Sequence, residues 1–307
     1  MKIPREKLEE HHGYVSHDNT FQRRARLLQA LWREEQGLPV GMHREKPLGS
    51  RLEMPRAMER LENYLTDGIR RVVRDEVLNP EKSRGKLYAK PRIFNDLLSS
   101  QPMCFNLFAE LKPDLELATE VFQKHCPGRV RKITSIEFEW SPGRGRKKFT
   151  GDRSAFDVYV TYESGKNKKG FMGIEVKYHE NLSGQPAVLI GRHERIARRS
   201  RVFDTACMPR LARMPLQQVY RDHLLALSML QAEIGFNEGC FVFLYPRDNA
   251  YCSRAVEKYS SCLEKGEAEP TFEPWTLEGL VKSIKSVTKR KWIRRFEQRY
   301  LGWGKIL

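Results

Sequence analysis

The chain has 307 residues, with 55 Lys and Arg against 39 Asp and Glu, so its formal net charge is +16. This charge predicts a polyanionic partner, most simply nucleic acid, and a merely basic soluble protein is the alternative. No run of about 20 apolar residues is present, and the N-terminus has no apolar signal core, so we expect no membrane partner. Six scattered cysteines without a CxxC pair argue against a zinc ribbon or a disulfide framework, and they fit a reducing, cytoplasmic setting.

Residues 1–93 are expected to form a helical N-terminal extension. Apolar residues recur near helical spacing over 18–37, where Asp18 or Thr20 is the expected cap and Gly37 the expected stop. Further expected elements are a Gly- and Pro-punctuated loop at 37–52, a long amphipathic helix at 55–78 and a second loop at 79–93.

Residues 94–307 are expected to form an α/β core. The expected elements are helices within 95–111 and 114–125, strands at 131–140, 154–163 and 170–180, a hairpin turn at 165–170, a helix at 215–235, a strand at 239–246 and helices over 248–307. The strand at 239–246 follows a helix, so it can join the sheet only through a crossover, which predicts a parallel pairing. The predicted fold class is α/β, with a mixed central sheet flanked by helices.

Charged residues interrupt two apolar strands of this core. Side chains alternate along a strand, so Glu175 and Lys177 share one face of the strand at 170–180. The expected hairpin brings Asp157, inside the apolar run AFDVYVTY, beside them. A buried charge is unfavourable unless it is paired, binds a metal or lines a cleft. Two carboxylates at one sheet edge suit Mg²⁺ or Mn²⁺, and a lysine beside them suits phosphodiester hydrolysis.

Two other interpretations of these residues stay open: a structural ion pair and a decayed active site. A second E-x-K occurs at Glu110 and Lys112, but it lies on a helical pattern that ends at Pro113 and has no partner acid. Buried ion pairs seldom stabilise a fold better than apolar residues do, so three ionisable groups on a sheet favour a catalytic role.

The segments GDRSAFDVYV and GIEVKYHE resemble the PD-(D/E)xK nuclease superfamily, the fold of many restriction endonucleases. The resemblance covers about residues 94–285. Within the superfamily, the sequence most resembles a branch of restriction-type endonucleases. It implies a restriction-endonuclease-like core, in which Asp157 and Glu175 bind the divalent metal and Lys177 is the catalytic lysine. Phe156 stands where the superfamily name has proline.

The same resemblance raises two further questions about site residues. Members of the superfamily often supply an acid from an early helix, and Glu110, Glu116 and Glu120 are all open candidates. In several branches a glutamine on the helix after the E-x-K strand assists the site, so Gln218 resembles that residue and is predicted to be catalytic. Its neighbour Arg221 is predicted to contact nucleic acid, and solvated polar residues at a helix start are the alternative for both.

Basic residues cluster in three further segments. The Gly-hinged loop at 141–153 is predicted to hold a nucleic-acid backbone, and solvated loop residues are the alternative. Its candidate residues are Arg144, Arg146, Lys147, Lys148 and Arg153. The run at 192–201 is a second candidate segment for binding phosphates. The run at 289–296 alternates bases with aromatics, which suits phosphate or single-strand contacts unless the aromatics anchor an amphipathic helix in the core.

Together these features predict a divalent-metal-dependent nuclease that hydrolyses double-stranded DNA, as a restriction-type or defence endonuclease. The alternatives are a structure-specific or repair nuclease, an RNA-processing enzyme and a DNA-binding protein with a decayed site. Cutting both strands with one site per chain favours a homodimer. The sequence announces no base-reading element, and it assigns no role to residues 1–93.

Overall fold

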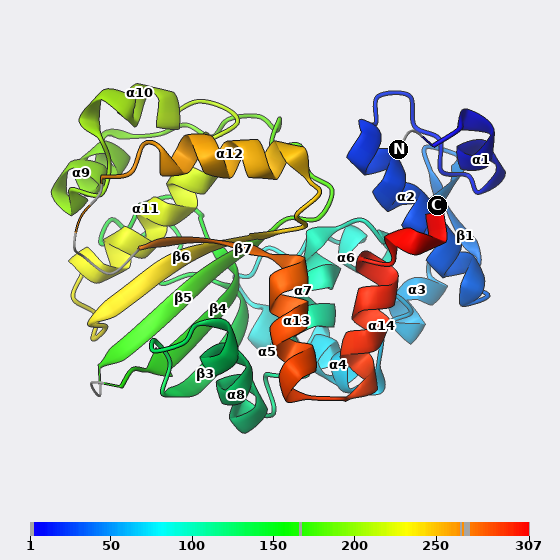
Figure 1. The fold of residues 1–307 in the computed structure, drawn as a ribbon, viewed down its shortest axis with the longest axis horizontal. Coiled ribbons are helices and arrows are strands. Elements are labelled where there is room, and N and C mark those ends of the chain that lie inside the picture. The colour runs from blue at the N-terminus through cyan, green and yellow to red at the C-terminus, as the bar shows by residue number, and fades with distance from the viewer. Residues whose placement is uncertain (1–2, 166–167, 265, 267–270, 307) are drawn as a thin grey trace. The chain divides into compact units, whose positions relative to one another are not determined.

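The structure is a computed structural model that describes residues 3–165, 168–264, 266 and 271–306 (Figure 1). The chain divides into two compact units, Met1–Pro113 with Ile284–Leu307 (unit 1) and Asp114–Ser283 (unit 2). The predicted boundary at residue 93 lies inside unit 1, and both ends of the printed chain belong to that unit. No helix among the described residues is long and apolar enough to span a membrane.

Unit 2 is built on a five-stranded mixed sheet (Figure 1). The strands in spatial order are β3 (Lys132–Trp140), β4 (Phe156–Glu163), β5 (Lys169–Val176), β6 (Glu238–Tyr245) and β7 (Phe272–Thr276). The first three strands pair antiparallel, whereas β5 with β6 and β6 with β7 pair parallel. The predicted fold class and the parallel pairing of the strand at 239–246 are therefore confirmed.

Helices cover this sheet. They are α8 (Leu115–His125), α9 (Gly191–Ser200), η2 (Thr205–Cys207), α10 (Met208–Leu211), α11 (Gln217–Gln231), α12 (Ala250–Ser260) and α13 (Leu277–Val287), which runs from unit 2 into unit 1. Helix α11 packs on β6 and on α9, and α8 packs on β3. The aromatic core under α11 includes Phe156, Phe171 and Phe241, all fully buried.

The prediction of helices alone over 248–307 is wrong, because β7 lies there as a short strand. Pro274 cannot donate a ladder hydrogen bond, so the sequence carries little strand signal and the strand sits at the sheet edge. The predicted turn at 165–170 includes residues 166–167, which lie outside the described residues, and the Ser164 N–H donates to the Lys168 carbonyl beside them at 2.9 Å.

Unit 1 is mostly helical. Its elements are α1 (Arg5–Glu10), α2 (Thr20–Glu35), β1 (Val40–His43), β2 (Lys46–Leu52), α3 (Arg56–Arg60), α4 (Asp67–Val73), η1 (Arg74–Leu78), α5 (Pro80–Ser83), α6 (Arg92–Asn95), α7 (Ser100–Phe108), α14 (Lys291–Tyr300) and η3 (Trp303–Ile306). Helix α2 confirms the helix expected over 18–37. Its cap is Asn19, whose side chain accepts from the Gln22 N–H at 3.0 Å, because the Asp18 carboxylate is engaged by Arg26 at 2.6 Å.

The loop expected at 37–52 is instead a β-hairpin. Strands β1 and β2 pair antiparallel, and the turn residues Arg44 and Glu45 have φ of 48° and 64°. Two-residue hairpin turns need this left-handed backbone and usually take Asn-Gly, so the Arg-Glu pair gave no turn signal.

The single helix expected at 55–78 is broken into α3, α4 and η1. Leu61 adopts a left-handed backbone at φ 52°, which ends α3. The Thr66 hydroxyl then accepts from the Ile69 N–H at 3.2 Å and starts α4. An amphipathic pattern can continue across such a break, because the apolar face resumes in phase on the next helix.

A buried arginine joins the ends of the chain within unit 1. Arg299 on α14 is fully buried, and its guanidinium lies 4.0 Å from the centre of the Trp32 ring on α2. It donates to Gln29 Oε1 at 3.0 Å and to the Asn63 carbonyl at 2.7 Å. The C-terminal helix is therefore an integral part of the unit 1 core.

Candidate active site

The strand register brings the predicted acids together. In the β4–β5 hairpin Val158 pairs with Ile174 and Tyr159 pairs with Gly173, so the same register sets Asp157 opposite Glu175. The Asp157 Oδ2 atom accepts from the Val176 N–H at 2.8 Å, which fixes this carboxylate against β5.

The residue before Asp157 explains the close fit of the two strands. A Cβ atom on Gly173 would lie 2.4 Å from the Phe156 ring, so only glycine leaves room for the ring at that point. Phe156 thus takes up a packing role on β4 at the position where the superfamily pattern has proline.

Glu175 and Lys177 form a buried ion pair. The Lys177 Nζ atom lies 2.6 Å from Glu175 Oε1, and each residue is 7% exposed. The Lys177 N–H donates to the Leu244 carbonyl at 2.8 Å, which continues the β5–β6 ladder one residue beyond β5. Their position on one strand face therefore holds in the structure.

Helix α11 supplies a third partner to Glu175. The Gln218 Nε2 atom donates to the same Oε1 atom at 2.7 Å. The adjacent Gln217 is not part of this group, because its side chain bonds the backbone of Ala187 and the carbonyl of Ala212. The sequence therefore singled out the glutamine that reaches the E-x-K strand.

The charges at this site shift one another's pKa values. Burial, and secondly the charge of Glu175, raise the pKa of Asp157 well above its usual range, against the opposing effects of Lys177 and of the Val176 N–H. Burial alone would lower the pKa of Lys177, but the charges of Glu175, Glu180 and Asp157 outweigh it and raise the pKa. Lys177 is therefore a stable cation in an acidic surrounding.

Sequence reasoning missed a further acid, Asp222. It is 2% exposed, and among the described residues its buried Oδ2 atom has no hydrogen-bond partner. Burial, and secondly the charge of Glu175, raise the pKa of Asp222. Asp222 follows Gln218 by four residues and so shares its helix face, a spacing that would have revealed it.

The early-helix acids do not join this group. Glu116 and Glu120 are exposed on α8, and Glu110 accepts a hydrogen bond from Thr66 inside unit 1. The acid that acts on Asp157 besides Glu175 is Glu139, at the end of β3. Glu139 pairs with Arg144 at 2.7 Å.

The predicted backbone-binding residues lie in two settings. Arg144 is held by Glu139, and it also donates to the Arg153 carbonyl at 2.5 Å. The side chains of Arg146, Lys147, Lys148 and Arg153 are exposed. Arg221 is half-buried on α11, and no hydrogen-bond partner for its Nε atom occurs in the described part of the chain.

The basic loop at 141–153 is tied to helix α9. Arg192 donates to the Phe149 carbonyl, and the Asp152 carboxylate lies 3.1 Å from the His193 ring. This bond, with the N–H of Ser154, lowers the pKa of Asp152, although its burial opposes the shift. The two basic segments predicted from the sequence therefore belong to one connected part of unit 2, which leads into Asp157.

The carboxylates fit a hard divalent cation. Asp157 accepts its protein hydrogen bond on Oδ2, and Glu175 accepts both of its bonds on Oε1. The other oxygen of each carboxylate has no protein partner within the described residues. No group of three or more His, Cys, Asp or Glu side chains arranged for a metal occurs in the described ranges. Mg²⁺ commonly takes one or two carboxylates and keeps several waters, so a two-carboxylate site suits it.

Comparison with known proteins gives one match. The model of a family described as the PD-(D/E)XK nuclease superfamily matches residues 16–302. No curated protein and no solved structure matches the chain. Since the family match runs through both units and includes the strands that carry Asp157 and Glu175, the chain belongs to the PD-(D/E)XK nuclease superfamily.

Proposed function

We propose that this chain is a Mg²⁺- or Mn²⁺-dependent deoxyribonuclease that hydrolyses phosphodiester bonds of double-stranded DNA. Membership of the superfamily indicates a metal-dependent nuclease. The observation that carries the proposal is the juxtaposition of Asp157 and Glu175 across one strand register, with Lys177 Nζ 2.6 Å from Glu175. The choice of DNA, the choice of metal and a restriction-type or defence role are parts of the proposal.

Asp157 and Glu175 would hold the cation, which when bound neutralises phosphate charge and lowers the pKa of a bound water. Lys177 lies in contact with Glu175, so it would donate a hydrogen bond to the attacking water or to a phosphate oxygen. Gln218 holds Glu175 Oε1 from the helix side, which keeps the carboxylate in one orientation.

The substrate backbone would approach through the loop that precedes Asp157. Arg146, Lys147, Lys148 and Arg153 offer exposed cations for phosphates, while Arg144 is engaged by Glu139 and orders the loop. Arg221 offers a guanidinium on the same helix as Gln218. One site per chain cuts one strand at a time, so a homodimer is the proposed arrangement for a double-strand break.

The test is cleavage of supercoiled plasmid by the purified chain with Mg²⁺, Mn²⁺ or EDTA. Lys177→Ala should lower the single-turnover rate by about 10²-fold or more, the scale for removing one charge-stabilising donor. Lys168→Ala, at an exposed lysine directly before β5, is the matched control and should cut like the original chain.

The outcomes separate the alternatives. Discrete fragments support a restriction-type enzyme, and a smear or a preference for branched substrates supports a structure-specific or repair nuclease. Cutting of RNA alone contradicts the choice of DNA. Metal-independent binding without cutting of any substrate contradicts the proposal and favours a DNA-binding protein with a decayed site.

A further inference from the structure

The net charge is unevenly divided between the two units. Unit 1 contains 29 Lys and Arg against 17 Asp and Glu, a net +12, whereas unit 2 contains 26 against 22, a net +4. The unit that carries the candidate active site thus holds the smaller part of the +16. We propose that unit 1 carries a second contact surface for the duplex backbone, centred on helix α14. The proposal rests on the proposed function for the identity of the nucleic acid.

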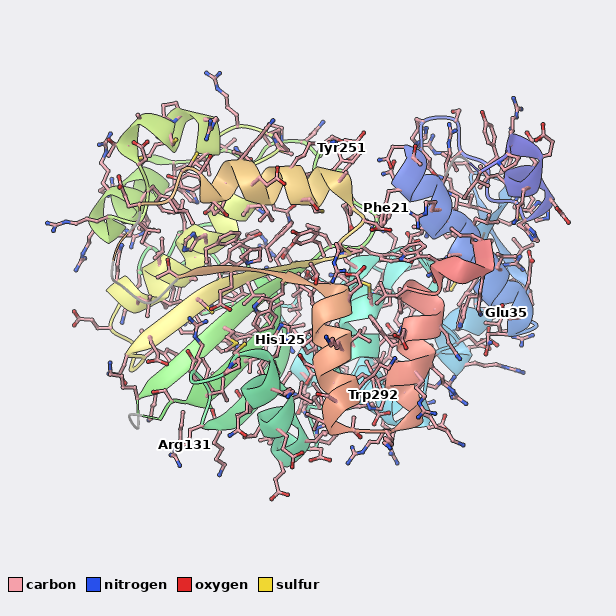
Figure 2. All side chains as sticks on the ribbon, viewed as in Figure 1. Phe21, Glu35, His125, Arg131, Tyr251 and Trp292 are labelled. Atoms are coloured by element: carbon pink, nitrogen blue, oxygen red, sulfur yellow. The ribbon has the colours of Figure 1, made fainter. Side chains whose placement is uncertain are left out.

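Helix α14 is strongly two-sided. Its inner face consists of Trp292, which is labelled in Figure 2, and of Ile293, Phe296, Arg299 and Tyr300, and all five are buried. Its outer face consists of Lys291, Arg294, Arg295 and Gln298, all exposed. These four positions follow helical spacing, so three cations and an amide form one continuous exposed stripe. We call it the α14 stripe.

The α14 stripe has no acid to neutralise it. Within the described residues Lys291 and Arg294 make no hydrogen bond or ion pair, and Arg295 uses only Nη1, which donates to the Leu65 carbonyl at 3.0 Å. The one acid of the helix, Glu297, is taken by Lys285 at 2.6 Å. Clustered cations without counter-charges repel one another, and binding of an external polyanion would relieve this repulsion.

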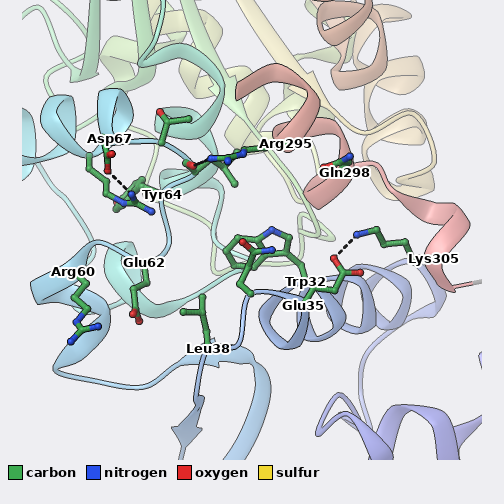
Figure 3. A pocket seen from close by; sticks show the side chains of 14 residues that line it. Trp32, Glu35, Leu38, Arg60, Glu62, Tyr64, Asp67, Arg295, Gln298 and Lys305 are labelled. Atoms are coloured by element: carbon green, nitrogen blue, oxygen red, sulfur yellow. Dashed lines mark hydrogen bonds and ion pairs between the residues drawn. The ribbon is translucent and has the colours of Figure 1, made fainter. Parts of the chain in front are cut away.

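A pocket of about 770 Å³ in unit 1 adjoins the stripe, since Arg295 and Gln298 also line it (Figure 3). Its three acids are Glu35, Glu62 and Asp67, and each is engaged. Their partners are Lys305 at 2.5 Å, Arg56 at 2.6 Å and Arg70 at 2.7 Å, respectively. Arg60 also lines the pocket and has no partner in the described part of the chain. The pocket wall therefore extends the positive surface beyond α14.

The surface suits phosphates better than bases or lipids. The pocket aromatics Trp32 and Tyr64 are 7% and 1% exposed, and Trp32 is covered by the Arg299 guanidinium, so neither presents a free ring face for a base. Binding of single strands depends on such stacking, whereas duplexes present a continuous phosphate backbone. The apolar face of α14 is in the protein core, so the helix has no face left to insert into a bilayer.

The test uses the full chain and measures duplex binding in EDTA by fluorescence anisotropy, as a function of salt. The variant is Lys291→Gln with Arg294→Gln and Arg295→Gln. The control is Lys132→Gln with Lys168→Gln and Lys169→Gln, three exposed lysines of unit 2 whose ammonium groups have no partner in the described residues. Both triple variants remove the same charge, so a general effect of net charge would appear equally in both.

Each phosphate contact contributes about 0.9 to the slope of log affinity against log salt. We expect the α14 variant to lower this slope by about 2 to 3 and to weaken binding about tenfold or more at low salt. The control should stay within about twofold, a change of about 0.4 kcal/mol. Thermal unfolding should be alike in both, because none of the six side chains is buried.

Equal losses in both variants, or an unchanged slope in the α14 variant, overturn the inference. Failure of the starting chain to bind any duplex also overturns it. Because the assay contains no metal and reads no cleavage, a chain that binds through α14 but does not cut DNA contradicts only the proposed nuclease function. A duplex RNA arm and an arm with anionic lipid vesicles show whether the phosphates belong to DNA, and preferential binding to RNA or vesicles contradicts the choice of DNA.

Discussion

The candidate site of unit 2 and the α14 stripe of unit 1 use charged residues in opposite ways. In unit 2 the decisive charges are buried and few, with Glu175 and Lys177 each 7% exposed and in contact at 2.6 Å. In unit 1 the surplus cations lie on the surface, and those of the α14 stripe have no acid within the described residues. Buried pairs are little affected by salt, whereas exposed cations are screened within about 10 Å at 0.1 M salt. Catalysis and backbone binding should therefore respond differently to the same change of conditions.

Glu175→Gln tests this comparison with the largest expected effect. The change removes the carboxylate charge that contacts Lys177 and lies opposite Asp157. We therefore expect the cleavage rate to fall about 10³-fold. Duplex binding in EDTA should change by less than about twofold, because we expect binding to depend on the exposed lysine and arginine side chains. Single-turnover cleavage and anisotropy on one preparation measure both. A parallel loss of binding would show that the site and the binding surface are not separable.

The two neighbouring glutamines of α11 form a matched pair. Gln218→Ala removes the donor to Glu175 and should lower the cleavage rate about 10- to 100-fold, with little change in melting temperature. Gln217→Ala removes three hydrogen bonds to the backbone of Ala187 and Ala212, so it should lower stability by about 1–3 kcal/mol. Urea unfolding and cleavage of both variants check this, and a reversed pattern would reassign the catalytic glutamine.

Asp222→Asn sharpens the contrast between buried and exposed charge. The carboxylate is buried without a partner for Oδ2 in the described residues, and its raised pKa means that ionisation disfavours the folded state as the pH rises above 3.8. At neutral pH the amide should therefore raise the free energy of unfolding by about 1–2 kcal/mol. Chemical denaturation without metal measures it, and destabilisation would show that the carboxylate itself holds the fold.

Protonation of two buried histidines should destabilise unit 2 in acid, against the opposite effect of Asp157 and Asp222, whose raised pKa favours the folded state as the pH falls. Burial lowers the pKa of His223 from 6.5 to about 3 and that of His125 to about 4. The unfolded chain therefore binds more protons between those values and pH 6.5, so stability falls as the pH drops through that window, by at most about 1.4 kcal/mol per unit for each histidine. The four histidines of unit 1 are not buried.

Hydrogen exchange of α11 and β6 at pH 7 and pH 5 measures the contribution of His223. In His223→Gln, whose amide can still bond Tyr259 or Thr271, this exchange should increase less between pH 7 and pH 5 than in the original chain. Helices α2 and α14 of unit 1 are the internal control. An equal increase in the variant and the original chain would contradict the assignment.

The sequence was sufficient to predict the position of site residues where these residues lie on a regular strand pattern. Alternation along two apolar strands placed Asp157, Glu175 and Lys177 on adjoining positions, and a hairpin can meet this pattern in few registers. It was insufficient where a residue type contradicts its backbone, as at the Arg44–Glu45 turn and the Pro274 strand. The addition of α14 to the unit 1 core depends on contacts between residues some 270 positions apart, such as Gln29 with Arg299. Such contacts cannot be predicted from a pattern among neighbouring residues.

The buried Arg299 also has a topological consequence. Because it anchors the C-terminal helix to α2, unit 2 is an insertion within unit 1, bounded by two crossings of the chain. Trimming a few turns from the C-terminus should therefore destabilise residues 1–113, whereas none of the strands of the unit 2 sheet lies in the segment removed. Removal of unit 2 with helix α13 left uncut should therefore disturb unit 1 less than truncation from either end.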